Sequence, residues 1–151
     1  MKTSAAIRVL AGAFSAVTLL GGAGTALAEE DFEKTLGRVE YQANCASCHG
    51  MAGKGDGPVA GQLKTQPPDL TGIMARNDGR FPFFEVYDVI AGETVVTPHG
   101  DPEMPVWGTR LTLDTEGSLE FGPPFPKGAV REIVEGRILR IVYYLRSIQE
   151  E

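Results

Sequence analysis

The sequence lacks the features of several large classes of protein. No segment shows a convincing alternation of apolar and polar residues, so a sheet protein is not expected. There is no internal repeat and no low-complexity tract. After residue 28, no stretch is long and apolar enough to span a bilayer. At 151 residues the chain is short for two ordinary domains, and we expect one site to carry the function.

Positive charge is also scarce. The chain contains twenty acidic residues and only fourteen Lys and Arg residues, which gives a formal net charge of −6. An acidic surface argues against nucleic acid and anionic lipid as partners, and it favours a protein partner with a basic docking face. The same acidity also serves solubility, which is its commonest role.

The first 28 residues have the architecture of an export signal. Lys2 and Arg8 supply a positive start, an uncharged run of small and apolar residues follows, and the A-x-A sequence of residues 26–28 predicts cleavage there. The run is short for a membrane anchor, which usually needs about 20 apolar residues. We therefore predict a cleaved signal peptide, residues 1–28, and a mature domain, residues 29–151, of net charge −8, because the signal takes two positive charges with it.

Helical periodicity occurs in three segments. Residues 31–43 place Phe32, Leu36, Val39 and Ala43 on one predicted face. Residues 83–91 form a second, shorter helical pattern, and Gly92 is a plausible stop. The strongest pattern is in residues 129–149, where the apolar positions are Val134, Ile138, Ile141, Leu145 and Ile148.

Two long segments rich in glycine and proline separate these helices. Residues 50–72 are expected to be a loop with a short helical turn near 59–63, and residues 92–128 are expected to be a second loop. Loops of this length in a small domain usually wrap something or are functional. Three short helices also supply little core, so we expect a bound group to occupy the middle of the fold.

Both cysteines lie in the hexapeptide CASCHG, residues 45–50, together with one of the two histidines. A thioredoxin-like dithiol would need a strand before this motif, but a helical pattern precedes it. A structural zinc site needs four ligands, and Cys45, Cys48, His49 and His99 reach that number. However, His49 directly after Cys48 is poorly placed to close the same tetrahedron, so both alternatives are disfavoured.

The pattern Cys-x-x-Cys-His is also the attachment signal of c-type haem. The two sulfurs form thioethers with the vinyl groups of the porphyrin, and the adjacent histidine binds the iron. Two intervening residues let Cys45 and Cys48 reach neighbouring vinyls, and they bring His49 over the metal. The motif, the export signal and the small core together predict one covalently bound haem c.

The second axial position decides what such an iron does. Methionine opposite histidine saturates the iron and raises its potential, whereas an open position suits sensing or peroxide chemistry. Met104 is the preferred candidate, because the prolines around it restrict the loop and hold the thioether at low entropic cost. Met51 is too close to His49 in sequence, Met74 is better explained by packing, and His99 is a rival ligand.

Trp107 follows Met104 by three residues. We expect it to pack on the haem edge or to donate its indole N–H to a propionate, with ordinary core packing as the alternative.

These residues resemble the class I c-type cytochromes over about residues 31–148. The resemblance implies an all-α fold, with three or more short helices and long loops wrapped around one covalent haem. It also implies that the first and last helices cross. Gly37 and Tyr41 correspond to the family's glycine and aromatic residue in the first helix. Ile141 and Tyr144 match the positions of the last helix that meet them.

The resemblance extends to two loops. GDGPVA resembles the family's loop whose proline carbonyl accepts a hydrogen bond from the haem-ligating histidine, which implies Pro58 for this role, with Pro67 and Pro68 as alternatives. MPVWG resembles the methionine-ligand loop. Residues 108–128 are longer than the same segment in compact members, and we expect a packing flap, a short hairpin or a docking surface there.

The sequence therefore predicts a soluble periplasmic electron carrier and not an enzyme. One haem c, held by Cys45 and Cys48 and ligated by His49 and Met104, would pass single electrons between redox proteins, with no small-molecule substrate. The expected state is a monomer, unless the chain is a haem subunit fixed in an oxidoreductase complex. An open-site haem sensor or peroxidase is the remaining alternative.

Overall fold

The computed structural model describes residues 23–94, 104–120, 122 and 124–150, with side chains from Phe32 onward. Within them the chain is helical and contains no strand. The elements are, in chain order, α1 (Ala23–Asn44), α2 (Ala46–His49), η1 (Ala60–Gln62), η2 (Ala75–Asn77), α3 (Phe83–Ala91), α4 (Trp107–Leu119) and α5 (Ala129–Ser147). The predicted all-α fold is confirmed, as are the three predicted helices and the turn near residues 59–63.

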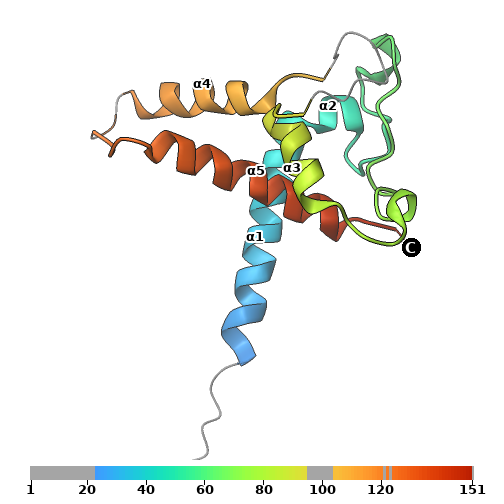
Figure 1. Cartoon of the computed structure of the whole chain (residues 1–151), viewed down its shortest axis with the longest axis horizontal. Helices are drawn as coiled ribbons and strands as arrows, with labels where there is room; N and C mark the ends of the chain where they lie inside the picture. Colours follow the sequence, from blue (N-terminus) through green and yellow to red (C-terminus); the bar gives the residue numbers. More distant parts are fainter. Residues whose placement is uncertain (1–22, 95–103, 121, 123, 151) are drawn as a thin grey trace, which may run out of the picture.

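The fold is organised by the crossing of α1 over α5 (Figure 1). Gly37 permits the close approach, because a Cβ at this position would lie 2.2 Å from the carbonyl oxygen of Arg140. One turn later the ring of Tyr41 packs against that of Tyr144, with 5.1 Å between centroids. The expected crossing of the first and last helices is therefore present, and Gly37 and Tyr41 mediate it.

The apolar face of α5 is the centre of the core. Val134, Ile138, Ile141 and Leu145 are buried as their spacing predicts, and Ile148 is half-buried. This helix is long enough to pack against α1, α3 and α4.

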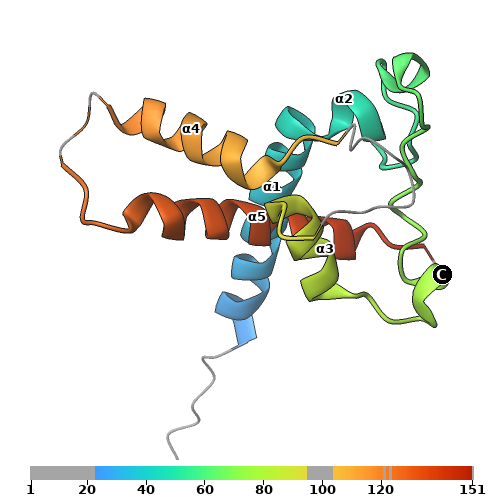
Figure 2. The same ribbon diagram turned by 45° about the horizontal axis from the view of Figure 1, so that its top comes forward.

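The predicted buried face of α1 is wrong. Phe32 and Val39 are 60% and 55% exposed, Ala43 is exposed, and only Leu36 is partly covered. The face of α1 that contacts α5 has Gly37 at its closest point. A glycine does not count as an apolar residue in a hydrophobic pattern, so the spacing of apolar residues indicated the wrong face. Both ribbon views also show the N-terminal part of α1 extending beyond the other helices (Figure 2).

The prediction of a loop over residues 92–128 is also wrong in its central part, because residues 107–119 form α4. This helix lies beside α5 in both views, with the chain running in the opposite direction (Figure 2). Leu111 and Thr115 bury one face of it. Of the three suggestions for residues 108–128, packing against the core is confirmed for the helical part, and the described residues of this segment contain no β-strand.

Arg137 joins three helices through ion pairs. Its guanidinium makes two hydrogen bonds to the Glu40 carboxylate on α1, of 2.8 and 3.0 Å. It also donates to Asp114 on α4 at 2.7 Å. The side chains of Arg137 and Glu40 are only 17% and 19% exposed, so water screens this pair less than an ordinary surface pair.

Replacement of Arg137 by alanine is expected to lower the free energy of unfolding by about 2 kcal/mol, because Glu40 would remain half-buried without its partner. Arg131→Ala is the matched control, since its pair with Glu135 is 82% exposed on the arginine side. Denaturant unfolding of the haem-loaded protein measures both. Equal, small effects of the two variants would show that the Arg137 network contributes nothing beyond a surface ion pair.

The predicted export signal falls mainly on residues 1–22, which lie outside the described residues, so its cleavage stays a prediction. None of the helices in the described part of the chain is long and apolar enough to cross a membrane.

Candidate functional site

The CASCHG motif forms the junction between α1 and α2. Cys45 lies between the two helices, and the turn closes with hydrogen bonds from the backbone N–H groups of Cys48 and His49 to the Cys45 carbonyl, of 3.1 and 2.9 Å. Both cysteines are free thiols. Burial, and next the neighbouring Cys48, raises the pKa of the Cys45 thiol to about 12. The motif therefore holds two unpaired thiols and an imidazole in one turn.

Tyr41 fixes the end of this motif through a hydrogen bond that no pattern in the sequence predicts. Its hydroxyl donates a 2.7 Å hydrogen bond to the carbonyl of Gly50, which has a positive φ of 80°. Burial is the main cause of the strongly raised pKa of Tyr41. The tyrosine that packs α1 on α5 thus also holds the residue after His49.

The hydrogen-bond partner of His49 is Pro68, so the assignment of Pro58 is wrong. His49 Nδ1 lies 3.4 Å from the carbonyl oxygen of Pro68, which was one of the two alternatives. Pro58 is exposed, and the N–H groups on either side of it, of Gly57 and Val59, donate to the carbonyls of Cys48 and Ser47. This stretch thus lies along the backbone of α2, and the chain reaches the imidazole ten residues later.

The contact to Pro68 determines which nitrogen is available to a metal. Engagement of Nδ1 leaves Nε2 as the ligand atom, an arrangement common to metal-binding histidines. Burial lowers the pKa of His49, and the bond to Pro68 opposes this in part. The imidazole is therefore favoured in its neutral form, which is the form that binds metals.

The loop that carries Pro68 is held by the C-terminal end of the chain. The side-chain amide of Gln149 donates to the Leu70 carbonyl at 2.8 Å and accepts from the Met74 N–H at 2.9 Å. The Leu70 N–H in turn donates to the Gly53 carbonyl at 2.7 Å. Met74 is half-buried, and its backbone N–H is part of these contacts.

A cavity of about 610 Å³ lies next to the motif. Its walls bring together residues distant in sequence, and most are apolar. They include the motif residues Cys45, Cys48 and His49, the loop residues Pro67, Pro68, Leu70 and Ile73, the α3 residues Val86, Val89 and Ile90, the segment Met104, Pro105, Val106 and Trp107, and Ile141 and Leu145 of α5.

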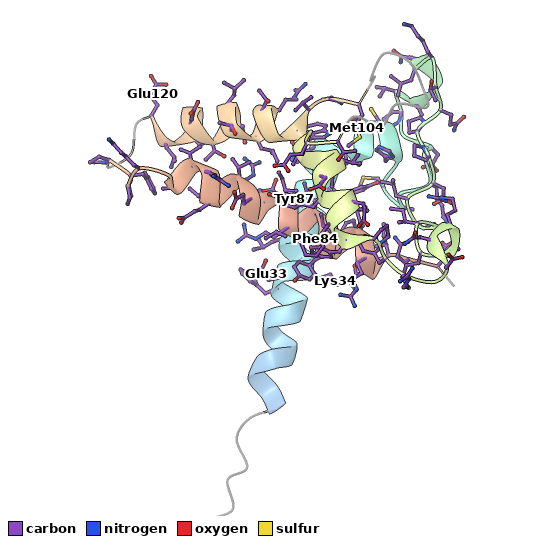
Figure 3. All side chains as sticks on the ribbon, viewed as in Figure 1. Glu33, Lys34, Phe84, Tyr87, Met104 and Glu120 are labelled. Carbon is purple, nitrogen blue, oxygen red and sulfur yellow. The ribbon has the colours of Figure 1, made fainter. Side chains whose placement is uncertain are left out.

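The cavity contains five of the six residues predicted for the site. Met104 lies in its wall together with His49, although 55 positions separate them, and Figure 3 labels this methionine on the segment leading into α4. Trp107 lines the cavity as well, and the Arg110 guanidinium lies 5.3 Å from the centre of its ring. Pro58 is not among the lining residues, nor are Met51 and Met74. The rival His99 lies outside the described residues.

These features fit a covalently held haem. Its attachment needs two free thiols, which line the cavity, and the iron needs a neutral imidazole, which Pro68 orients. A flat apolar macrocycle needs an apolar pocket of several hundred cubic ångströms, and this cavity has that size and character. His49 and Met104 are the residues that would hold the iron, with Cys45 and Cys48 as the thioether anchors.

Comparison with known protein families identifies a match. The family model described as Cytochrome c matches residues 35–149, which is most of the chain and includes every predicted site residue. Neither the curated proteins nor the solved structures contain a match. Members of this family bind haem c covalently, one per domain, and have a haem-based electron-transfer role. The motif, the cavity beside it and the match over residues 35–149 together show that this chain belongs to the cytochrome c family.

Proposed function

We propose that this protein is a single-electron carrier whose haem iron is ligated by His49 and Met104. The observation that carries the proposal is the presence of both side chains in the wall of one cavity, next to the two cysteines. A methionine opposite a histidine leaves no open position for a substrate, and it raises the potential into a range suited to electron transfer.

Each part of the chain has a distinct task in this proposal. Bound haem supplies the one-electron couple between ferrous and ferric iron. Pro68 holds the imidazole of His49 in one orientation, and Pro105 restricts the backbone beside Met104. The apolar side chains of the cavity exclude water. Rigid ligands and a dry pocket favour the same coordination in both oxidation states, which keeps the reorganisation on electron transfer small.

The cellular context completes the proposal. The N-terminal export signal supports a periplasmic location, and the acidic composition supports redox protein partners with a basic docking face. The protein works as a monomeric shuttle between a donor complex or dehydrogenase and an acceptor. The alternative, a haem subunit fixed in an oxidoreductase, differs in having a permanent partner, and co-purification from native membranes and periplasm separates the two.

A potentiometric titration of methionine variants tests the ligand assignment. Met104→Ala is expected to lower the midpoint potential substantially, because the thioether ligand is lost. Met51→Ala is the control, since Met51 is 62% exposed and is not part of the cavity wall. Identical potentials for the two variants and the wild type would exclude Met104 as a ligand.

A further inference from the structure

A second hollow lies where α3, α4 and α5 meet. It has a volume of about 480 Å³ and is open to solvent. Val134 and Ile138 of α5, both buried, form its floor together with Ala91 of α3. Gly108 and Thr112 of α4 also line it. Figure 3 labels Tyr87, another lining residue, on α3 beside α5. We call this hollow the α3–α5 groove.

The rim of the α3–α5 groove is acidic. Glu93 follows α3, Glu116 lies on α4 and Glu135 on α5, and among the described residues that line the groove Arg131 is the one basic residue. Arg131 is 82% exposed and is bound to Glu135 at 2.6 Å, so it neutralises only one of the three carboxylates. The groove therefore combines an apolar floor with a negative rim.

The charges of the rim act on the groove itself. The pKa of the Tyr87 hydroxyl is raised, first by burial and then by the negative charges of Glu135, Glu93 and Asp88, which outweigh the opposing positive charge of Arg131. Carboxylates from two different elements thus lie close enough to one side chain of the groove to affect its ionisation. A positive group placed there would be stabilised by the same field.

We propose that the α3–α5 groove is the docking site for a lysine side chain on the basic face of a redox protein partner. A lysine fits both parts of the groove, because its aliphatic stem packs on apolar side chains while its ammonium group needs carboxylates at the rim. A bound metal ion does not fit. No cluster of His, Cys, Asp and Glu in the described part of the chain is suited to hold one. The inference rests on the proposed electron-transfer function.

The groove is well placed for a redox partner, because it shares a wall with the haem cavity. Ile90 and Trp107 line the cavity, whereas their chain neighbours Ala91 and Gly108 line the groove. At Gly108 a Cβ would lie 2.4 Å from the Ala91 carbonyl oxygen, so α3 and α4 meet there in backbone contact. A partner held at the groove is therefore separated from the cavity by a single layer of chain.

The groove also gives a role to the segment 108–128, whose sequence predicted a packing flap, a short hairpin or a docking surface. α4 supplies one wall of the groove, and its residue Glu116 is part of the rim. Gly128, at the other end of the segment, lines the groove as well. Docking was one of the functions expected for these residues. In this proposal the segment serves a dedicated partner, and it also contributes Leu111 and Thr115 to the core.

Carbodiimide cross-linking tests the proposal, because this reagent joins a carboxylate to an amine only where the two are in contact. The probe is the pentapeptide Lys-Ala-Lys-Ala-Lys, added to the haem-loaded protein at low ionic strength, and mass spectrometry locates the conjugates. The variant Glu93→Gln, Glu116→Gln, Glu135→Gln removes the rim charges. The matched control is Asp78→Asn, Glu120→Gln, Glu132→Gln, which removes the same charge at exposed positions outside the groove.

We expect conjugates to be about tenfold more frequent at the three rim glutamates than at Asp78, Glu120 and Glu132, and to decrease when salt screens the rim. The rim variant should lose most of the total conjugate and the control variant little. Conjugates spread evenly over all acidic residues, or equal losses in the two variants, would overturn the proposal. A wild type that lacks a reversible one-electron titration would instead refute the proposed function, whatever the cross-linking result.

Discussion

Replacement of both Cys45 and Cys48 by serine is expected to abolish covalent haem attachment completely. Serine hydroxyls do not form the thioethers, and these are the only two cysteines in the chain. The variant is also expected to lose its cooperative thermal transition. The helices enclose a cavity of about 610 Å³ lined by apolar side chains, and a vacant cavity of that size removes much of the packing that stabilises the fold.

Haem staining after denaturing electrophoresis measures attachment, and thermal unfolding followed by circular dichroism measures the structural effect. Ser47→Ala is the matched control, because Ser47 is an exposed residue between the two cysteines. It should retain the stain and the transition. Stained protein from the double serine variant would contradict the assignment of the thioether anchors.

Replacement of Gly37 by alanine is expected to cost about 3 kcal/mol of stability, although it adds only one methyl group. The new Cβ would lie 2.2 Å from the Arg140 carbonyl oxygen and 2.9 Å from the Tyr144 Cβ. Neither neighbour can move without separating α1 from α5, so the crossing itself must change. Because Tyr41, one turn along α1, contacts both Tyr144 and Gly50, the disturbance should also reach the haem motif.

Gly136→Ala in α5 provides an internal control for this prediction. A Cβ at Gly136 would have no neighbour within 4 Å, so the substitution should stabilise the protein by roughly 0.5–1 kcal/mol through helix propensity. Denaturant unfolding of the haem-loaded variants measures both effects. If the two alanine variants changed stability in the same direction and by similar amounts, the close approach at Gly37 would not be what fixes the crossing.

Local patterns were sufficient to predict the parts of the fold that depend on short stretches of sequence. Residues 83–91 form a helix that ends at Gly92, which has a positive φ of 83°, because glycine adopts this conformation without strain. The spacing of the apolar residues in α5 also predicted its buried face, because this long helix is covered from several sides. The CASCHG motif was informative because its chemistry depends on spacing within six residues.

The errors arise where distant segments decide the outcome. α4 contains two glycines, three threonines and one serine, so its local helix propensity is weak. The helix is stabilised by packing on α5 and by the Asp114 pair with Arg137. Pro68 reaches His49 because Gln149, near the end of the chain, holds the following loop. Pro58 matched the family pattern in sequence distance alone, and no local signal distinguished it from Pro68.

The optical spectrum of the oxidised, haem-loaded wild type tests whether His49 and Met104 both ligate the iron. We expect a weak far-red band from a methionine–ferric iron bond, its loss in Met104→Ala and its retention in Met51→Ala. We also expect that the reduced wild type does not bind carbon monoxide readily. A wild-type spectrum without the band, together with ready binding of carbon monoxide, would show an open iron and would contradict the assignment of this protein as an electron carrier with His49 and Met104 as ligands.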